Sequence, residues 1–131
     1  MYKVTIPMRL PGLNEYIAAC NSSRYKGNNL KQSTQEDIGY FLKKLPYLDK
    51  PIRIHFTWIS TKSDRRDPDN IASACKYILD SMQQVGKLKN DSRKYITGLY
   101  HDFEIGSEYA VIMEIEELKA FELKENIDEK S

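Results

Sequence analysis

The sequence predicts an α+β domain with a single mixed β-sheet, two main helices packed on it and a C-terminal β-hairpin. Segments in which apolar and polar residues alternate are interleaved with two segments of helical periodicity. A glycine-containing pair separates the last two strand-like segments, which is typical of a hairpin. The chain has 131 residues, of which 40% are hydrophobic, and this is enough for one domain with a modest core.

The first half of the chain predicts two strands and one helix. Residues 2–7 alternate weakly and predict a first strand. Residues 10–31 are polar and rich in Asn, Ser and Gly, so we expect a long loop there. Apolar side chains recur at helical spacing over residues 34–45, and Pro46 ends that predicted helix. Residues 52–59 alternate apolar and polar, which predicts a strand with one buried face.

The second half predicts a charged loop, a helix, a basic loop and two strands. The charged loop covers residues 61–68. The strongest helical prediction is residues 70–85, with Gly86 as its C-terminal stop. A basic loop follows over residues 87–94. The last two strands are predicted over residues 95–105 and 108–116, joined at Gly106-Ser107.

Charge is unevenly distributed along the chain. The net charge is +1, but residues 1–113 hold 17 basic and 12 acidic residues, a net of +5. A basic body suits a polyanionic partner, although an ordinary solvated surface gives the same count. We place the domain at residues 1–117 and an acidic C-terminal tail at residues 118–131. No apolar run approaches the roughly 20 residues of a membrane helix, and no signal-peptide segment is evident, so a cytoplasmic protein is expected.

Cysteine and histidine give no separate motif. Cys20 and Cys75 have no CxxC spacing, which excludes a zinc-finger pattern and argues against a disulfide framework. Cys75 falls on the apolar face of its helix and is interpreted as a buried thiol. His55 and His101 stand alone and are interpreted as surface or core residues. Trp58 shares the buried parity of its strand and is expected in the core.

The acidic residues after the second strand carry the functional prediction. Asp67 and Asp69 are one residue apart and follow Arg65 and Arg66, and Asp91 returns after the predicted helix. Mg²⁺ prefers oxygen ligands and is usually held by a few carboxylates together with phosphate oxygens. Such an ion can activate water and stabilise the leaving oxygen at a phosphodiester. The three acids therefore predict a metal site, while a turn and helix cap is the structural alternative.

Helical geometry adds further residues to this predicted site. At about 100° per residue, Lys76 and Asp80 fall on the same helix face as Asp69. Lys76 is predicted to contact a phosphate or to stabilise developing charge. Asp80 is either an additional ligand or the salt-bridge partner of Lys76. Arg66 is placed to contact the DNA backbone. The other candidate DNA-binding residues lie in the predicted loops: Arg65, Lys62, Lys89, Arg93, Lys94, Asn14 and Arg24.

These residues resemble the RusA family of Holliday junction resolvases. The likeness covers nearly the whole chain to about residue 117. It is carried by Arg66-Asp67-Pro68-Asp69-Asn70, Lys76-Tyr77-Ile78-Leu79-Asp80, Asn90-Asp91 and the early Pro11-Gly12-Leu13-Asn14. The resemblance implies a homodimeric endonuclease that depends on Mg²⁺, or on Mn²⁺ in its place, and nicks four-way DNA junctions in recombination and repair.

The same resemblance assigns roles to individual residues. It implies that Asp67, Asp69 and Asp91 are the metal-binding acids, that Lys76 is the essential lysine and that Arg66 is the arginine before the first acid. Lys76 stands about three residues later than in the best-known member, close to one helical turn. Two alternatives remain. One is a DNA-binding or regulatory protein on the same fold that does not cleave. The other is a metal-dependent nuclease for other branched DNA.

Overall fold

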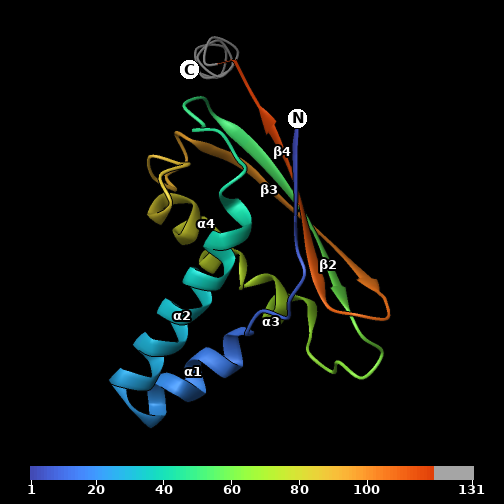
Figure 1. The fold of residues 1–131 in the computed structure, drawn as a ribbon. Coiled ribbons are helices and arrows are strands. Elements are labelled where there is room, and N and C mark those ends of the chain that lie inside the picture. The colour runs from blue at the N-terminus through green and yellow to red at the C-terminus, as the bar shows by residue number, and fades with distance from the viewer. Residues whose placement is uncertain (120–131) are drawn as a thin grey trace, which may run out of the picture.

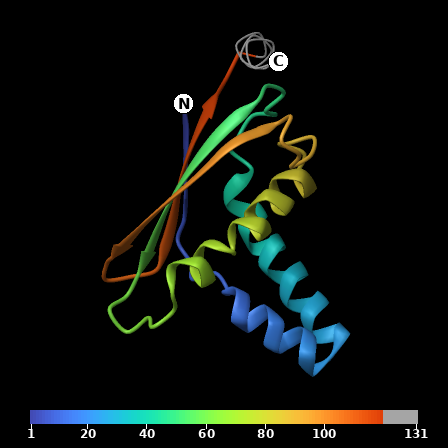
Figure 2. The same ribbon diagram turned by 180° about the vertical axis from the view of Figure 1, so that it is seen from behind.

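The chain folds into one mixed four-stranded sheet with its helices on one face (Figure 1, and Figure 2 from behind). The structure is a computed structural model and describes residues 1–119. The predicted α+β class with a single mixed sheet is confirmed. Most of the predicted acidic tail, residues 120–131, lies outside the described residues. The elements are β1 (Tyr2–Ile6), α1 (Leu13–Ser22), α2 (Arg24–Leu42), β2 (Ile52–Ser60), α3 (Pro68–Ala72), α4 (Cys75–Gln84), β3 (Ile96–Ile105) and β4 (Ala110–Glu117).

The strand order is β1-β4-β2-β3, so β2 separates β3 from β4 and the predicted C-terminal hairpin is wrong. β3 runs parallel to β2, whereas β4 is antiparallel to both β2 and β1. The Gly106-Ser107 link therefore passes the end of β2, where the Gly106 N–H donates to the Ser60 carbonyl at 2.9 Å. A Cβ at Gly106 would lie 2.8 Å from Ile59 Cγ2. The glycine thus serves a close approach and not a two-residue turn.

The core lies between the helix-side face of the sheet and helices α2 and α4. The alternation predicted for β2 is confirmed, because Ile54, Phe56 and Trp58 are buried at every second position. The two main helices contribute buried apolar residues to the same core: Ile38 and Leu42 from α2, and Ile78 and Met82 from α4. The predicted burial of Trp58 is therefore confirmed.

The predicted long loop over residues 10–31 is wrong, because α1 and the first half of α2 occupy it. α1 has no buried residue, so it leaves no apolar periodicity in the sequence. The Ser23 side chain caps α2 by accepting the Lys26 N–H at 3.0 Å. A Cβ at Gly27 would lie 2.5 Å from Cys20 Sγ, so the glycine lets the two helices approach closely. Within residues 1–119, no helix is both long and apolar enough to cross a membrane.

The single helix predicted over residues 70–85 is divided into α3 and α4. At the break, the Lys76 N–H donates to the Ser73 carbonyl and the Tyr77 N–H to the Ala74 carbonyl, at 3.2 and 3.1 Å. These bonds span three residues instead of four, so the turn is tighter than an α-helix. A rotation of about 100° per residue does not hold from Asp69 across this break. It holds within α4, where Lys76 and Asp80 share a face.

Candidate functional site

Asp67 and Asp69 stand at the start of α3. Asp67 is the extended N-cap residue (φ −71°, ψ 156°), and Pro68 follows at the first helical position. The Asp67 carbonyl accepts a hydrogen bond from the Ile71 N–H, but its side chain makes no capping bond. The Asp69 carboxylate accepts the Asn70 N–H at 2.9 Å. The turn-and-cap role therefore uses the Asp67 backbone and leaves its exposed carboxylate available to a ligand.

Lys76 contacts two acids from different segments. Its Nζ lies 2.5 Å from Asp91 Oδ2 and 2.9 Å from Asp80 Oδ1. Hydrogen bonds with Asp91 and Asp80 raise the pKa of Lys76, and the Lys76 ammonium lowers the pKa of Asp91. Asp80 also lies 3.6 Å from Lys31 Nζ and accepts a hydrogen bond from Gln35 at 3.3 Å. These five residues are termed the lysine cluster, and in it Asp80 is the salt-bridge partner of Lys76.

The predicted acids do not form a closed metal cage. Among residues 1–119, no group of three or more Asp, Glu, His or Cys side chains is arranged to hold an ion. Asp91 is paired with the Lys76 ammonium instead. The donor chemistry of Asp67 and Asp69 still suits Mg²⁺, because this ion commonly uses one or two carboxylates together with waters and substrate phosphates. A metal held by these acids would therefore share its coordination with the substrate.

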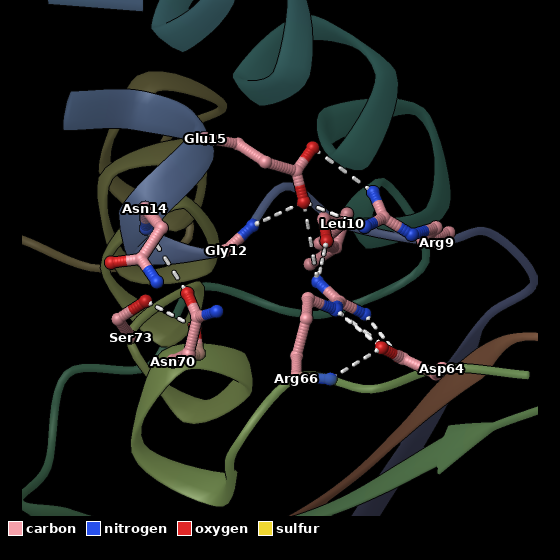
Figure 3. A network of polar contacts seen from close by, with 9 residues as sticks. All are labelled: Arg9, Leu10, Gly12, Asn14, Glu15, Asp64, Arg66, Asn70 and Ser73. Carbon is pink, nitrogen blue, oxygen red and sulfur yellow. Dashed lines mark hydrogen bonds and ion pairs between the residues drawn. The ribbon is translucent and has the colours of Figure 1, made fainter. Parts of the chain in front are cut away.

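Arg66 is held inside a second polar network (Figure 3). Its guanidinium and backbone N–H donate to the Asp64 carboxylate at 2.8–3.1 Å, and its Nη1 donates to the Leu10 carbonyl at 2.9 Å. Glu15 lies 3.7 Å from Arg66 and is bound by Arg9 at 2.6 Å. Hydrogen bonds from Arg66 lower the pKa of Asp64 to about 2. These five residues are termed the arginine cluster, in which Arg66 is held by contacts within the chain. The DNA contact of Arg66 stays a prediction.

Asn70 ties the acidic motif to the first helix (Figure 3). Its side-chain oxygen accepts the Asn14 backbone N–H at 3.1 Å, in the first turn of α1. A Cβ at Gly12, the N-cap residue of α1, would lie 2.4 Å from Asn70 Oδ1. Asn70 thus supplies the capping oxygen that a glycine N-cap lacks. The Ser73 hydroxyl donates to the Asn70 carbonyl at 2.7 Å and fixes the residue from the other side.

The other candidate DNA-binding cations are exposed and lie on three segments. Lys62 and Arg65 belong to the loop before α3, and Arg24 begins α2. The loop that carries Asp91 presents the remaining three, Lys89, Arg93 and Lys94. Lys94 Nζ lies over the Tyr95 ring, 5.6 Å from its centroid. Cations therefore border the acidic residues in sequence on both sides.

Each of the two histidines contacts a side chain on the neighbouring strand. His55 contacts an acid, and His101 contacts an aromatic residue. His55 Nε2 lies 2.6 Å from Asp102, on the open face of the sheet. The Trp58 indole N–H donates to His101 Nδ1 at 2.9 Å. Burial and the neighbouring His55 lower the pKa of His101. Sequence reasoning missed these pairs because they depend on the parallel register of β2 and β3.

Sequence reasoning also missed Asp64, Glu15 and the cavity beside Lys76. The local signal for Asp64 was an acid two residues before Arg66, but the Leu10 and Glu15 contacts come from a distant segment. The cavity has a volume of about 190 Å³ and is lined by Leu13, Tyr16, Lys31, Ser73, Lys76 and Tyr77. This volume accommodates one benzene-sized group.

The chain matches no protein-family model, and no curated protein matches it in sequence.

Proposed function

We propose that this chain is a Mg²⁺-dependent endonuclease that acts as a homodimer and nicks four-way DNA junctions. The Lys76–Asp91 ion pair, 2.5 Å long, is the observation that carries the proposal. The pair connects Lys76 on α4 to Asp91 in the loop after α4. Two parts of the motif that are separate in the sequence are therefore in contact. The resemblance to RusA family resolvases supplies the four-way junction as the substrate.

The residues of the motif divide the chemistry between them. Asp67 and Asp69 supply oxygen ligands for Mg²⁺, which when bound activates water and stabilises charge at the scissile phosphate. Once Lys76 exchanges the Asp91 carboxylate for a phosphate oxygen, it stabilises negative charge on that phosphate. The released Asp91 would then join Asp67 and Asp69 in holding the Mg²⁺. Arg66 holds the segment before Asp67 in place through Asp64.

The exposed cations of the flanking loops would contact the DNA backbone. Lys62 and Arg65 precede the acids, and Lys89, Arg93 and Lys94 surround Asp91 in sequence. Contacts of this kind position DNA without reading its sequence. Binding should therefore weaken steeply as the salt concentration rises.

Cleavage of a synthetic four-way junction tests the proposal, with Mg²⁺, with Mn²⁺ and with a chelator. Wild type should nick only when metal is present, and Asp91→Asn should bind the junction but lose nicking. Asp37→Asn removes an exposed acid on α2 and is the matched control, which should nick like wild type. A linear duplex of the same sequence separates junction resolution from general nuclease activity. Nicking that survives the chelator or Asp91→Asn would overturn the mechanism.

A DNA-binding protein that does not cleave is the second candidate. The lack of a three-acid group within residues 1–119 favours it. Such a protein would bind the junction equally well with metal and with chelator, and would leave every strand intact. A nuclease for other branched DNA would instead cut flaps or three-way junctions faster than four-way junctions.

A further inference from the structure

β3 forms a long, apolar edge of the sheet. It is the last strand in the order β1-β4-β2-β3 and has ten residues. Leu99, Phe103 and Ile105 are 40%, 41% and 73% exposed. In the register with β2, Leu99 and Phe103 lie beside the buried Ile54 and Trp58. The apolar side chains on the helix-side face of the sheet therefore continue from β2 to β3. Among residues 1–119, no further strand pairs with the outer edge of β3.

The opposite edge of the sheet is protected against pairing. β1 has five residues, includes Lys3 and is followed at once by Pro7. β3 contains no Lys, Arg or Pro. Natural edge strands avoid pairing with other chains by being short, by carrying proline or charges, above all lysine, or by a bulge. β3 has a bulge only near its start, at the register shift opposite Ile52 and Arg53, and its only charges are the acids Asp102 and Glu104. Residues 98–105 are therefore suited to receive a partner strand whose register keeps these acids apart.

We propose that a second copy of the chain docks on β3, with the two β3 strands antiparallel about a two-fold axis at His101. The two four-stranded sheets would then form one continuous sheet. The inference rests on the proposed function only in its need for two subunits, because the edge itself is a property of the fold. One surface meeting its own copy is the arrangement that closed two-fold dimers use.

The side chains of β3 favour this register over the two registers centred on Asp102 and Phe103. An axis normal to the sheet keeps the helix-side faces of the two copies together. Centred on His101, it sets Leu99 opposite Phe103 of the second copy. Centred on Asp102, it sets two like carboxylates opposite each other, and centred on Phe103 it sets Asp102 opposite Glu104. Like charges directly opposite destabilise strand pairs. Of these three registers, the one at His101 joins apolar side chains without opposing charges.

His101 also suits a position on the axis. Burial and the nearby His55 lower its pKa, so the ring is neutral at pH 7 and two rings can face each other without repulsion. Its Nδ1 accepts the Trp58 indole N–H at 2.9 Å, which fixes the ring. Directly opposed residues of antiparallel strands have Cα atoms about 4.5–5.5 Å apart. Disulfides form at this separation.

Cysteine cross-linking of the full chain tests the register. Cys20→Ser removes the exposed native thiol and serves as the background. In that background, His101→Cys should give a disulfide-linked dimer under mild oxidation, because the residue faces itself. Asp102→Cys alone should not, but a mixture with Tyr100→Cys should. Cross-linking by Asp102→Cys alone, without cross-linking by His101→Cys, would overturn the register.

The mass in solution tests the surface. By light scattering, wild type should have twice the 15.3 kDa mass of the chain. Leu99→Lys should weaken association at least about tenfold, because each substitution acts twice across the axis. Leu13→Lys is the matched control, since Leu13 is 45% exposed and Leu99 is 40% exposed. Circular dichroism checks that each variant is folded. A monomeric wild type, or a dimer that Leu99→Lys leaves intact, overturns the proposal.

Nicking measured on the same samples separates this surface from the proposed function. A monomer that nicks four-way junctions overturns both the β3 surface and the homodimer of the proposed function, and leaves the Mg²⁺-dependent cleavage standing. A dimer that cross-links through residue 101 and does not nick supports the surface and counts against the nuclease.

Discussion

The arginine cluster and the lysine cluster are both built on a short ion pair, but their surroundings differ. The Arg66 and Asp64 side chains are 12% and 5% exposed, whereas those of Lys76 and Asp91 are 60% and 31% exposed. Arg66 makes several parallel hydrogen bonds to one carboxylate. Lys76 divides its ammonium between two carboxylates. The two clusters therefore have similar ion-pair distances. They differ in the burial of the paired side chains and in the number of carboxylates that share the cation.

This difference sets what each cluster can do. Removing one partner of a buried pair leaves an uncompensated charge and typically costs about 3–5 kcal/mol. An exposed pair is worth about 0–1 kcal/mol and can be exchanged for another partner at little cost. The arginine cluster is therefore suited to hold the loop before α3 rigidly. The lysine cluster is suited to release an acid when a phosphate arrives.

The largest expected effect separates activity from stability at Lys76. Lys76→Met should lower the nicking rate about 100- to 1000-fold, because the positive charge opposite the phosphate is lost. Its free energy of unfolding should stay within about 0.5 kcal/mol of wild type, since the Lys76 ammonium is exposed and Asp80 keeps Lys31 and Gln35 as partners. Initial nicking rates and urea unfolding of the same preparation measure both quantities.

Lys26→Met, which removes an exposed lysine of α2, is the control for the loss of one positive charge. It should change neither quantity appreciably. A Lys76→Met protein that nicks at the wild-type rate would mean that the lysine cluster has no part in the chemistry.

The next effect concerns the arginine cluster alone. Asp64→Asn keeps the shape of the side chain but removes the charge that compensates Arg66. We expect a loss of about 2–4 kcal/mol in the free energy of unfolding, measured in urea. Asp37→Asn should change the same quantity by less than about 0.5 kcal/mol. Equal stabilities of the two variants would show that the Arg66–Asp64 pair is not a structural contact.

The sequence could predict the helices and strands that have one buried face, because burial gives their apolar residues a regular spacing. Residues 52–59 alternate because one face of β2 is buried, and the apolar side chains of α4 recur because they meet the core. α1 has no buried residue, so no periodicity predicted it. The order of the strands depends on pairing between distant segments, and a local turn signal at Gly106-Ser107 could not reveal that β2 lies between β3 and β4.

The same distinction applies to the candidate site. The Lys76–Asp80 contact follows from four-residue spacing within one helix and was predictable. The break at Ser73 was not predictable from the sequence. The helix face calculated for Asp69 was therefore wrong, because the calculation assumed one continuous α-helix through a turn of different geometry. The internal role of Arg66 depends on Asp64, on Glu15 and on the Leu10 carbonyl, which only the folded chain brings together.

Acid should weaken the arginine cluster in a defined pH range. The pKa of Asp64 is lowered from 3.8 to about 2 in the folded protein by Arg66. A group with a lowered folded pKa stabilises the fold above its unfolded pKa and loses that contribution as pH falls through the folded value. About 2 kcal/mol of stability should therefore be lost between about pH 5 and pH 2.

Urea unfolding of wild type and Asp64→Asn at several pH values measures this loss. The difference between the two proteins should be largest at pH 6 and should shrink as the pH approaches 2. A constant difference across this range would show that Asp64 keeps an ordinary pKa, and the pair would then resemble the exposed lysine cluster.

The smallest effect is expected at Asn70, whose contact with α1 is a neutral hydrogen bond between the two clusters. Asn70→Ala should cost about 1 kcal/mol, the usual value of a helix cap, and Asn70→Asp should cost less because it keeps an acceptor oxygen. Gly12→Ala should also destabilise the protein, since the new Cβ would lie 2.4 Å from Asn70 Oδ1. Part of that cost should disappear in the Asn70→Ala background, giving a coupling of at least about 0.5 kcal/mol. Two costs that simply add would show that the Asn70 side chain does not lie against Gly12. An Asn70→Ala protein as stable as wild type would show that Asn70 does not cap α1, and the acidic motif would then be positioned by the arginine cluster alone.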